Sequence, residues 1–96
     1  MVESAFQRSI CEELKQRFPD CVVLKNDSNY IQGFPDLLIL YNDKWAALEC
    51  KRSSDAHRQP NQDWYVTKLN GMSFASFIFP ENRNEVMNEL ERSLKA

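Results

Sequence analysis

The chain has 96 residues, of which 43% are hydrophobic and 11% aromatic, and this predicts a single domain over residues 1–96 with its own core. No apolar run is long enough for a membrane span and no signal peptide is apparent, so we expect a cytoplasmic, intracellular protein. The net charge of -2 excludes a strongly basic nucleic-acid-binding domain and predicts modest, salt-sensitive affinity for any nucleic acid. Three cysteines cannot all pair within one chain and match no zinc motif, so we expect reduced thiols.

Residues 2–18 are predicted to form the first helix. Apolar residues recur at every fourth position, the spacing of one helix face; they are Phe6, Ile10, Leu14 and Phe18. Glu3 and Gln7 fall on this same face. An inward-pointing Glu3 needs a partner, which a nearby metal site would supply; the alternative is a solvated Glu3 in a frayed terminus.

Residues 21–25 are rich in β-branched residues and predict the first strand, which ends at Lys25. A polar loop over residues 26–33 follows and leads directly to Asp36. Its small side chains, among them Ser28 and Asn29, suit contacts to phosphate groups. An ordinary connection between strands is the alternative for any one of them.

Residues 37–41 and 45–48 predict two strands joined by the turn residues Asn42 and Asp43. A two-residue loop places Tyr41 opposite Lys44. Counting back along both strands then places Asp36 directly opposite Glu49, with Cβ atoms roughly 5 Å apart.

Lys51 shares a face with Glu49 because side chains alternate along a strand. Two carboxylates at this distance repel each other, so one takes up a proton or a cation lies between them. Mg²⁺ prefers such oxygen ligands and retains several waters, while Lys51 would orient an attacking water or stabilise developing charge. The alternative is a solvated charged hairpin face on which Lys51 only offsets the two acids.

A second helix is predicted from Pro60, which suits a first turn, to a closing Asn70-Gly71 pair. Gln62 falls on its sheet-facing side, and Trp64 falls on the other side as a candidate partner surface or a loop contact. His57, the only histidine, lies in the preceding loop, where it contacts phosphate, acts as a base or is simply solvated. An apolar strand over residues 74–79 and a helix over residues 82–95 complete the chain.

Together, these pieces resemble a known family. Pro35-Asp36 and Glu49-Cys50-Lys51 match the PD-(D/E)XK signature of restriction-endonuclease-like nucleases. The virus-type replication–repair nuclease (VRR-NUC) branch adds an early helical Glu, a Gly-x-Pro-Asp segment and a later helical Gln. Here these pieces are similar to Glu3 with Gln7, residues 33–36, and Gln62, in the same order.

The resemblance implies an α/β fold with a restriction-endonuclease-like αβββαβ core, in which a small mixed sheet is flanked by helices. It implies a Mg²⁺- or Mn²⁺-dependent endonuclease that acts on DNA, especially branched DNA such as four-way junctions or flaps, and that works as a homodimer. Metal ligands would be Asp36, Glu49, the Cys50 carbonyl and, through water or a second ion, Glu3.

By the same resemblance, Lys51 would activate water, Gln62 would orient Lys51 or the water, and Gln7 would support Glu3. The candidate nucleic-acid contacts are Lys25, Ser28, Asn29, Arg52 and Arg58. Cys50 departs from the aliphatic residue usual between Glu and Lys, and no catalytic group is missing. Two other classes stay open: a nucleic-acid-binding module without catalysis, and a protein-interaction domain on the same fold. A phage or bacterial context is an association with short stand-alone chains of this type.

Overall fold

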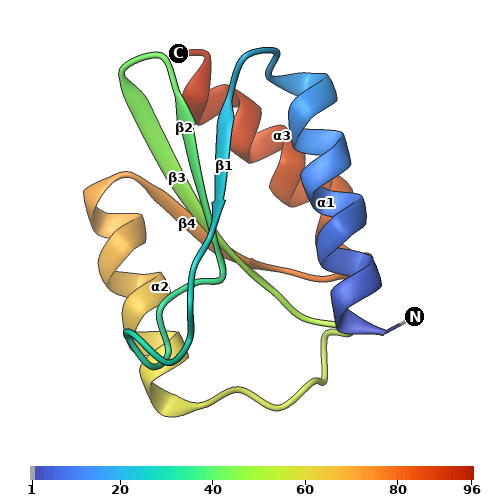
Figure 1. Ribbon diagram of the computed structural model, residues 1–96, viewed down its shortest axis with the longest axis vertical. Helices are drawn as coiled ribbons and strands as arrows, with labels where there is room; N and C mark the ends of the chain where they lie inside the picture. Colours follow the sequence, from blue (N-terminus) through green and yellow to red (C-terminus); the bar gives the residue numbers. More distant parts are fainter. Residues whose placement is uncertain (1) are drawn as a thin grey trace.

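The structure is a computed structural model that describes residues 2–96 (Figure 1). The helices and strands follow the expected order, with one short 3-10 turn added before the last helix. The elements are α1 (Glu3–Arg17), β1 (Val22–Lys25), β2 (Leu37–Tyr41), β3 (Lys44–Cys50), α2 (Pro60–Met72), β4 (Phe74–Ile78), η1 (Pro80–Asn82) and α3 (Arg83–Leu94).

The four strands form one mixed sheet in the order β1-β2-β3-β4. Neighbours are antiparallel from β1 to β3, and β4 runs parallel to β3 because α2 carries the chain back between them. The α/β class and the αβββαβ core are therefore confirmed, with α3 as an additional helix. Within residues 2–96, no helix is both long and apolar enough to cross a membrane.

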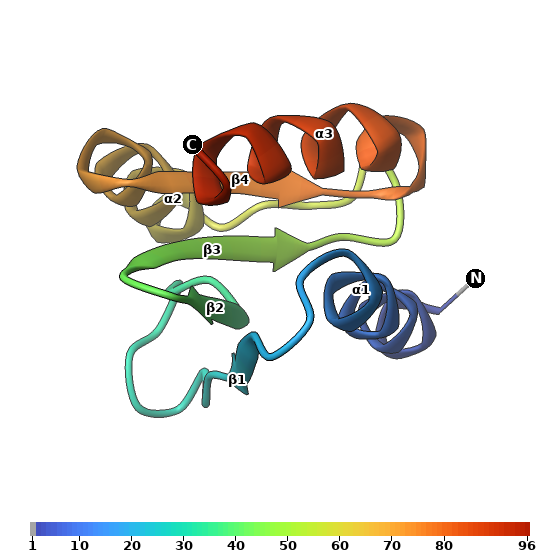
Figure 2. The same ribbon diagram turned by 90° about the horizontal axis from the view of Figure 1, so that it is seen from above.

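Helices cover the two faces of the sheet unequally. Helices α1 and α3 lie on one face and α2 lies on the other (Figures 1 and 2). Side chains of β3 alternate between them: Leu48 and Cys50 belong to the large core under α1 and α3, whereas Ala47 packs with Leu69 of α2. Since every residue from Ala46 to Cys50 is buried, β3 is the central strand of the molecule.

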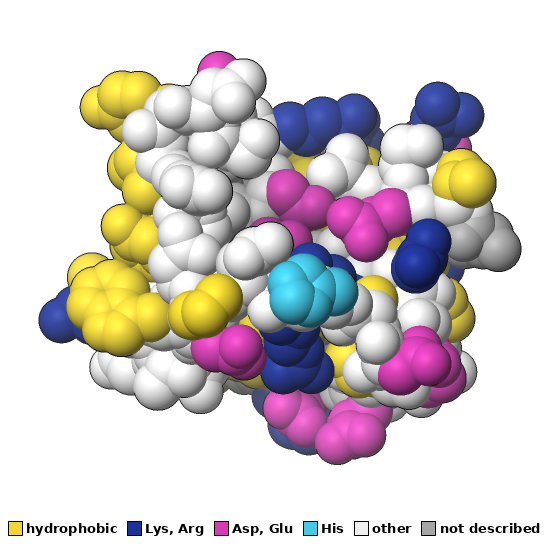
Figure 3. All heavy atoms as spheres, turned by 90° about the horizontal axis from the view of Figure 1, so that it is seen from below, with side chains coloured by type: hydrophobic (Ala, Val, Ile, Leu, Met, Phe, Trp, Pro, Cys, Tyr) yellow, Lys and Arg dark blue, Asp and Glu magenta, His cyan; other side chains and the backbone are white. Residues whose placement is uncertain are grey.

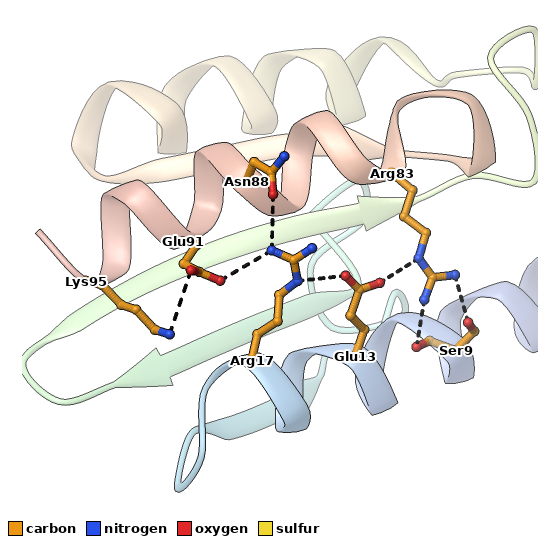
Figure 4. A network of polar contacts seen from close by, with 7 residues as sticks. All are labelled: Ser9, Glu13, Arg17, Arg83, Asn88, Glu91 and Lys95. Carbon is orange, nitrogen blue, oxygen red and sulfur yellow. Dashed lines mark hydrogen bonds and ion pairs between the residues drawn. The ribbon is translucent and has the colours of Figure 1, made fainter.

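A polar network fixes α1 against α3 (Figure 4). Arg83 of α3 lies 2.7 Å from Glu13 and also donates to the Ser9 hydroxyl at 2.8 Å. Arg17 pairs with the other oxygen of Glu13 at 2.8 Å and with Glu91 at 3.3 Å. The network fixes the second half of α1, from Ser9 to Arg17, against α3.

The end of α2 differs from the prediction. The helix continues to Met72, and Gly71 keeps a helical backbone instead of closing the helix in the left-handed region. The Asn70 side chain accepts a hydrogen bond from the Ala75 N–H at 3.1 Å, so it joins α2 to β4. The predicted closing pair was wrong, because the helix continues through both residues and the Asn70 side chain caps the start of β4 instead.

All three cysteines are free thiols, as expected. Cys11 and Cys50 are buried, and Cys21 is half-buried.

Candidate active site

The hairpin of β2 and β3 brings the two predicted acids together. Asn42 and Asp43 form the connection, with Asn42 at φ 55°, a conformation that asparagine tolerates better than most residues. Tyr41 pairs with Lys44, which confirms the predicted register, and the pairing continues to Leu37 opposite Leu48. One step further, the Asp36 N–H donates to Glu49 Oε1 at 3.2 Å.

Asp36 is held on both carboxylate oxygens. Its Oδ1 accepts a hydrogen bond from the Cys50 N–H at 3.0 Å, and its Oδ2 accepts one from the Gln7 amide at 2.9 Å. We expected Gln7 to support Glu3, but the Gln7 amide contacts Asp36 across the gap between α1 and the sheet. Asn26, which the sequence analysis missed, donates its N–H to the Asp36 carbonyl at 2.8 Å and its amide to the Pro35 carbonyl at 2.7 Å.

Lys51 follows β3 and is 8% exposed. Its Nζ donates to the His57 carbonyl and to Gln62 Oε1, both at 3.0 Å, and lies 3.9 Å from Glu49 Oε2. Because Gln62 Oε1 also accepts the Gln59 N–H at 2.9 Å, the Gln62 amide nitrogen must face Glu49, to which it donates at 3.2 Å. Gln62 thus contacts both Lys51 and Glu49 from the first turn of α2.

Burial and mutual repulsion govern the charge of the two acids. Burial, and after it the nearby charge of Asp36, raise the pKa of Glu49 from 4.5 to about 8, while Lys51 opposes the change. Burial also raises the pKa of Asp36, although the hydrogen bonds from the Cys50 N–H and Gln7 lower it. Such a pair is stable with a bound proton or with a cation beside it.

The donor set fits a hard divalent cation. Mg²⁺ is commonly bound through one or two carboxylates, with water and substrate phosphate completing its shell, and Asp36 and Glu49 supply two. Continuing the register places Pro35 opposite Cys50. Because proline has no N–H, β2 supplies no donor to the Cys50 carbonyl, the third ligand that the resemblance implies. Among residues 2–96, no three His, Cys, Asp or Glu side chains converge as a ready metal cluster, so Glu3 is not part of one.

Glu3 lies at the rim of the site and its side chain is exposed. It lines a hollow of about 420 Å³ together with Val2, Arg52, Ala56 and His57. The charge of Glu3 raises the pKa of both Asp36 and Glu49, but it is the smallest of the causes, and burial is the largest. Glu3 therefore belongs to the solvated edge of the acidic site.

The predicted nucleic-acid contacts divide into exposed and engaged residues. Arg52 and His57 are exposed in the hollow beside Glu3, and acidic and basic side chains surround the histidine on this face (Figure 3). Arg58 is also exposed, but its guanidinium lies 4.0 Å from the centre of the Phe77 ring and pairs with Asp63 at 3.3 Å.

Ser28 and Asn29 line a second hollow of about 460 Å³ on the other side of Gln62, and Lys25 is exposed at the end of β1. Trp64 is 59% exposed, as expected, and lines a third hollow with Lys68 on the outer side of α2.

Several contacts at the site have little or no sequence signal. The His57 carbonyl is a backbone group, so its role as an acceptor for Lys51 depends only on the path of the loop over residues 51–59. Asn26 had a usable signal, because extending the β1–β2 register by one residue from Lys25 opposite Leu37 places it opposite Asp36.

No family model matches the chain, and no curated protein or solved structure matches it.

Proposed function

We propose that this protein is a metal-dependent nuclease of the PD-(D/E)XK type, which hydrolyses phosphodiester bonds of DNA. The observation that carries the proposal is the convergence of Asp36, Glu49 and Lys51 at the end of the central strand. A buried pair of acids with raised pKa values, next to a buried lysine, is costly for folding. Such arrangements are concentrated at functional sites.

In this proposal, Asp36, Glu49 and the Cys50 carbonyl hold Mg²⁺ or Mn²⁺. The bound ion would polarise a phosphate oxygen and lower the pKa of a water. Lys51 has three N–H donors, and two of them are held by the His57 carbonyl and Gln62. The third is free to orient the attacking water or to stabilise charge on the phosphate in the transition state.

Gln62 acts as a positioning residue. It fixes Lys51 through its oxygen and Glu49 through its nitrogen, so the distance between the lysine and the acid is set by one side chain. Gln7 performs the same task for Asp36 from α1. Glu3, at the rim, would reach the ion only through water or a second ion.

The proposed substrate is branched DNA, such as four-way junctions or flaps, and the proposed assembly is a homodimer. The basic side chains near the site are few, with Arg52 exposed and Arg58 engaged by Phe77 and Asp63. A domain of 96 residues also has little surface with which to read a long DNA sequence, which favours recognition of DNA shape. Two copies would present two sites for paired cuts.

A nucleic-acid-binding module without catalysis is the second candidate, and one observation favours it. Each carboxylate oxygen of Asp36 and Glu49 already accepts a hydrogen bond from within the protein. Acids satisfied in this way can be structural. In that case, replacing Asp36 by Asn would leave function unchanged or strengthen binding, because a negative charge near phosphate is removed.

Cleavage of labelled DNA with Mg²⁺ or Mn²⁺ tests the proposal. The panel consists of a four-way junction, a flap, a duplex and a single strand. We expect the wild type to cut the branched substrates, and Lys51→Ala and Asp36→Asn to lower the rate about a hundredfold or more, as loss of a transition-state contact does. Lys44→Ala is the matched control, since Lys44 lies at the opposite end of β3.

Two checks make the result decisive. Thermal melting of each variant separates lost chemistry from lost folding, because Lys51 is buried and its removal leaves Glu49 without its cation. Calorimetric titration with Mn²⁺ should give binding to the wild type that Asp36→Asn weakens. Folded wild-type protein that cuts no substrate with either ion would reject the nuclease and leave the binding module.

A further inference from the structure

A hollow of neutral polar groups adjoins the acidic site. It has a volume of about 460 Å³ and is lined by Ser28, Asn29, Gln32, Gly33, Gln59 and Gln62. Gln62 belongs to both places, because its amide also contacts Glu49 at 3.2 Å and Lys51 at 3.0 Å. A group bound in the hollow would therefore lie next to the reacting centre.

The two hollows that flank the acidic site differ in chemistry. The hollow at Glu3 carries Arg52 and His57, which suit a phosphate. The hollow at Gln62 has no charged side chain in its lining, only hydroxyl, amide and backbone groups. The side-chain amides of Asn29 and Gln32 each present a donor and an acceptor side by side, the pattern that reads the edges of nucleobases, whereas the Gln62 amide is already engaged by Lys51 and Glu49.

The walls of the neutral hollow are held together before any ligand arrives. Asn61 of α2 donates its amide to the Gln32 carbonyl at 2.9 Å, which joins the loop over residues 26–33 to the helix. Gly33 permits this approach, because a Cβ at that position would lie 2.5 Å from Asn61 Cγ. The Asn29 N–H donates to Asp27 Oδ1 at 2.8 Å and fixes the outer turn of the loop. Such preorganisation lowers the entropic cost of binding.

We propose that the hollow lined by Ser28, Asn29, Gln32 and Gln62 is a nucleobase-binding subsite, which receives the unstacked base of a nucleotide next to the scissile phosphate. The inference rests on the proposed nuclease function and adds base recognition to it. Ser28 and Asn29 thus contact a base edge instead of phosphate. A branch point supplies such a base readily, since its nucleotides are incompletely stacked and extruding them costs less than in a duplex.

The test is an NMR titration of the metal-free protein, labelled with ¹⁵N, against each of the four deoxynucleosides and, separately, inorganic phosphate. We expect at least one deoxynucleoside to shift the side-chain amide signals of Asn29 and Gln32 in a saturable manner. Inorganic phosphate should instead shift the backbone signals of Arg52 and His57. Asn29→Ala should weaken nucleoside binding about tenfold, the size of one good base contact. Asn84→Ala, an exposed asparagine in α3, is the matched control and should change nothing.

Two results would overturn the subsite: no shift with any of the four deoxynucleosides, or shifts of the Asn29 and Gln32 amides with phosphate alone. Neither result depends on cleavage. If DNA is cut but nucleosides do not bind, the subsite fails and the nuclease stands. If nucleosides bind but no DNA is cut, the nuclease fails and the base-binding hollow stands.

Discussion

Glu49 is buried beside Asp36, and this single residue should control how stability depends on pH. Its pKa in the folded protein is raised to about 8, against 4.5 ordinarily, mainly because burial disfavours the charged form. The folded protein thus holds a proton that the unfolded chain releases, and the raised pKa of Asp36 acts in the same direction. The contribution of these acids to the stability of the fold is therefore fully present below about pH 4.5 and is lost as pH rises towards 8.

We expect the free energy of unfolding of the metal-free protein to fall by a few kcal/mol between pH 5 and pH 8, since one pKa unit corresponds to about 1.4 kcal/mol. Urea denaturation in the presence of a chelator measures it. Glu49→Gln keeps the size of the side chain and cannot ionise, so its profile should be much flatter. Equal slopes for the two proteins would contradict the assignment. Excess Mg²⁺ should restore stability at pH 8 in the wild type alone if the ion binds at this acid.

At the scale of elements, the contact between the loop over residues 26–33 and α2 depends on a glycine. Gly33 has φ 86°, a region that residues with a side chain rarely adopt, and an added Cβ would meet Asn61. We predict that Gly33→Ala destabilises the protein by ~1–3 kcal/mol through strain and loss of the Asn61 to Gln32 hydrogen bond. Equilibrium unfolding in urea is the measurement.

The same chain provides the control. Gly71 lies in α2 with nothing within 4 Å of an added Cβ, so Gly71→Ala should stabilise the protein by about 0.5–1 kcal/mol. The two substitutions are chemically identical and are expected to have opposite signs. A stabilising Gly33→Ala would show that the loop is not fixed against α2 as the structure has it.

The β2–β3 hairpin was predictable because its information is local. Asn42 and Asp43 define a two-residue connection, and the register that follows determines which side chains face each other down to Asp36 and Glu49. Helical periodicity likewise placed Gln7 and Gln62 towards the sheet, where both contact the acids. In each case, the geometry follows from counting along one or two adjacent elements.

Contacts between distant segments could not be obtained in this way. The Asn61 to Gln32 hydrogen bond and the His57 carbonyl beside Lys51 depend on how loops without periodicity lie over the sheet. Arg58 shows the same limit, since its sequence position suggests a phosphate contact but its guanidinium lies over Phe77. The local pattern therefore predicted which acids meet, and tertiary packing decided what surrounds them.

At the scale of the whole molecule, one part of the sheet has no helix over it. Helix α2 packs on β3 and β4, and the same face of β1 and β2 carries exposed Val22, Leu24 and Leu40. In residues 2–96, β1 pairs with β2 alone, so its other edge is open. Two identical edge strands can pair antiparallel about a two-fold axis. With a net charge of only -2, two copies repel each other weakly. We therefore propose that a second copy of this chain pairs with this open edge of β1.

We predict that the wild type behaves as a dimer in light scattering, with twice the 11.3 kDa mass of one chain, and that Leu24→Lys yields the single-chain mass. A lysine on β1 would bring two like charges together across the two-fold axis and leave them desolvated. Met72→Lys is the matched control, because Met72 is also exposed, at 64%, but lies at the end of α2. It should not change the dimer. A wild-type mass of 11.3 kDa at high protein concentration would reject the dimer, and paired cuts would then require two separate binding events.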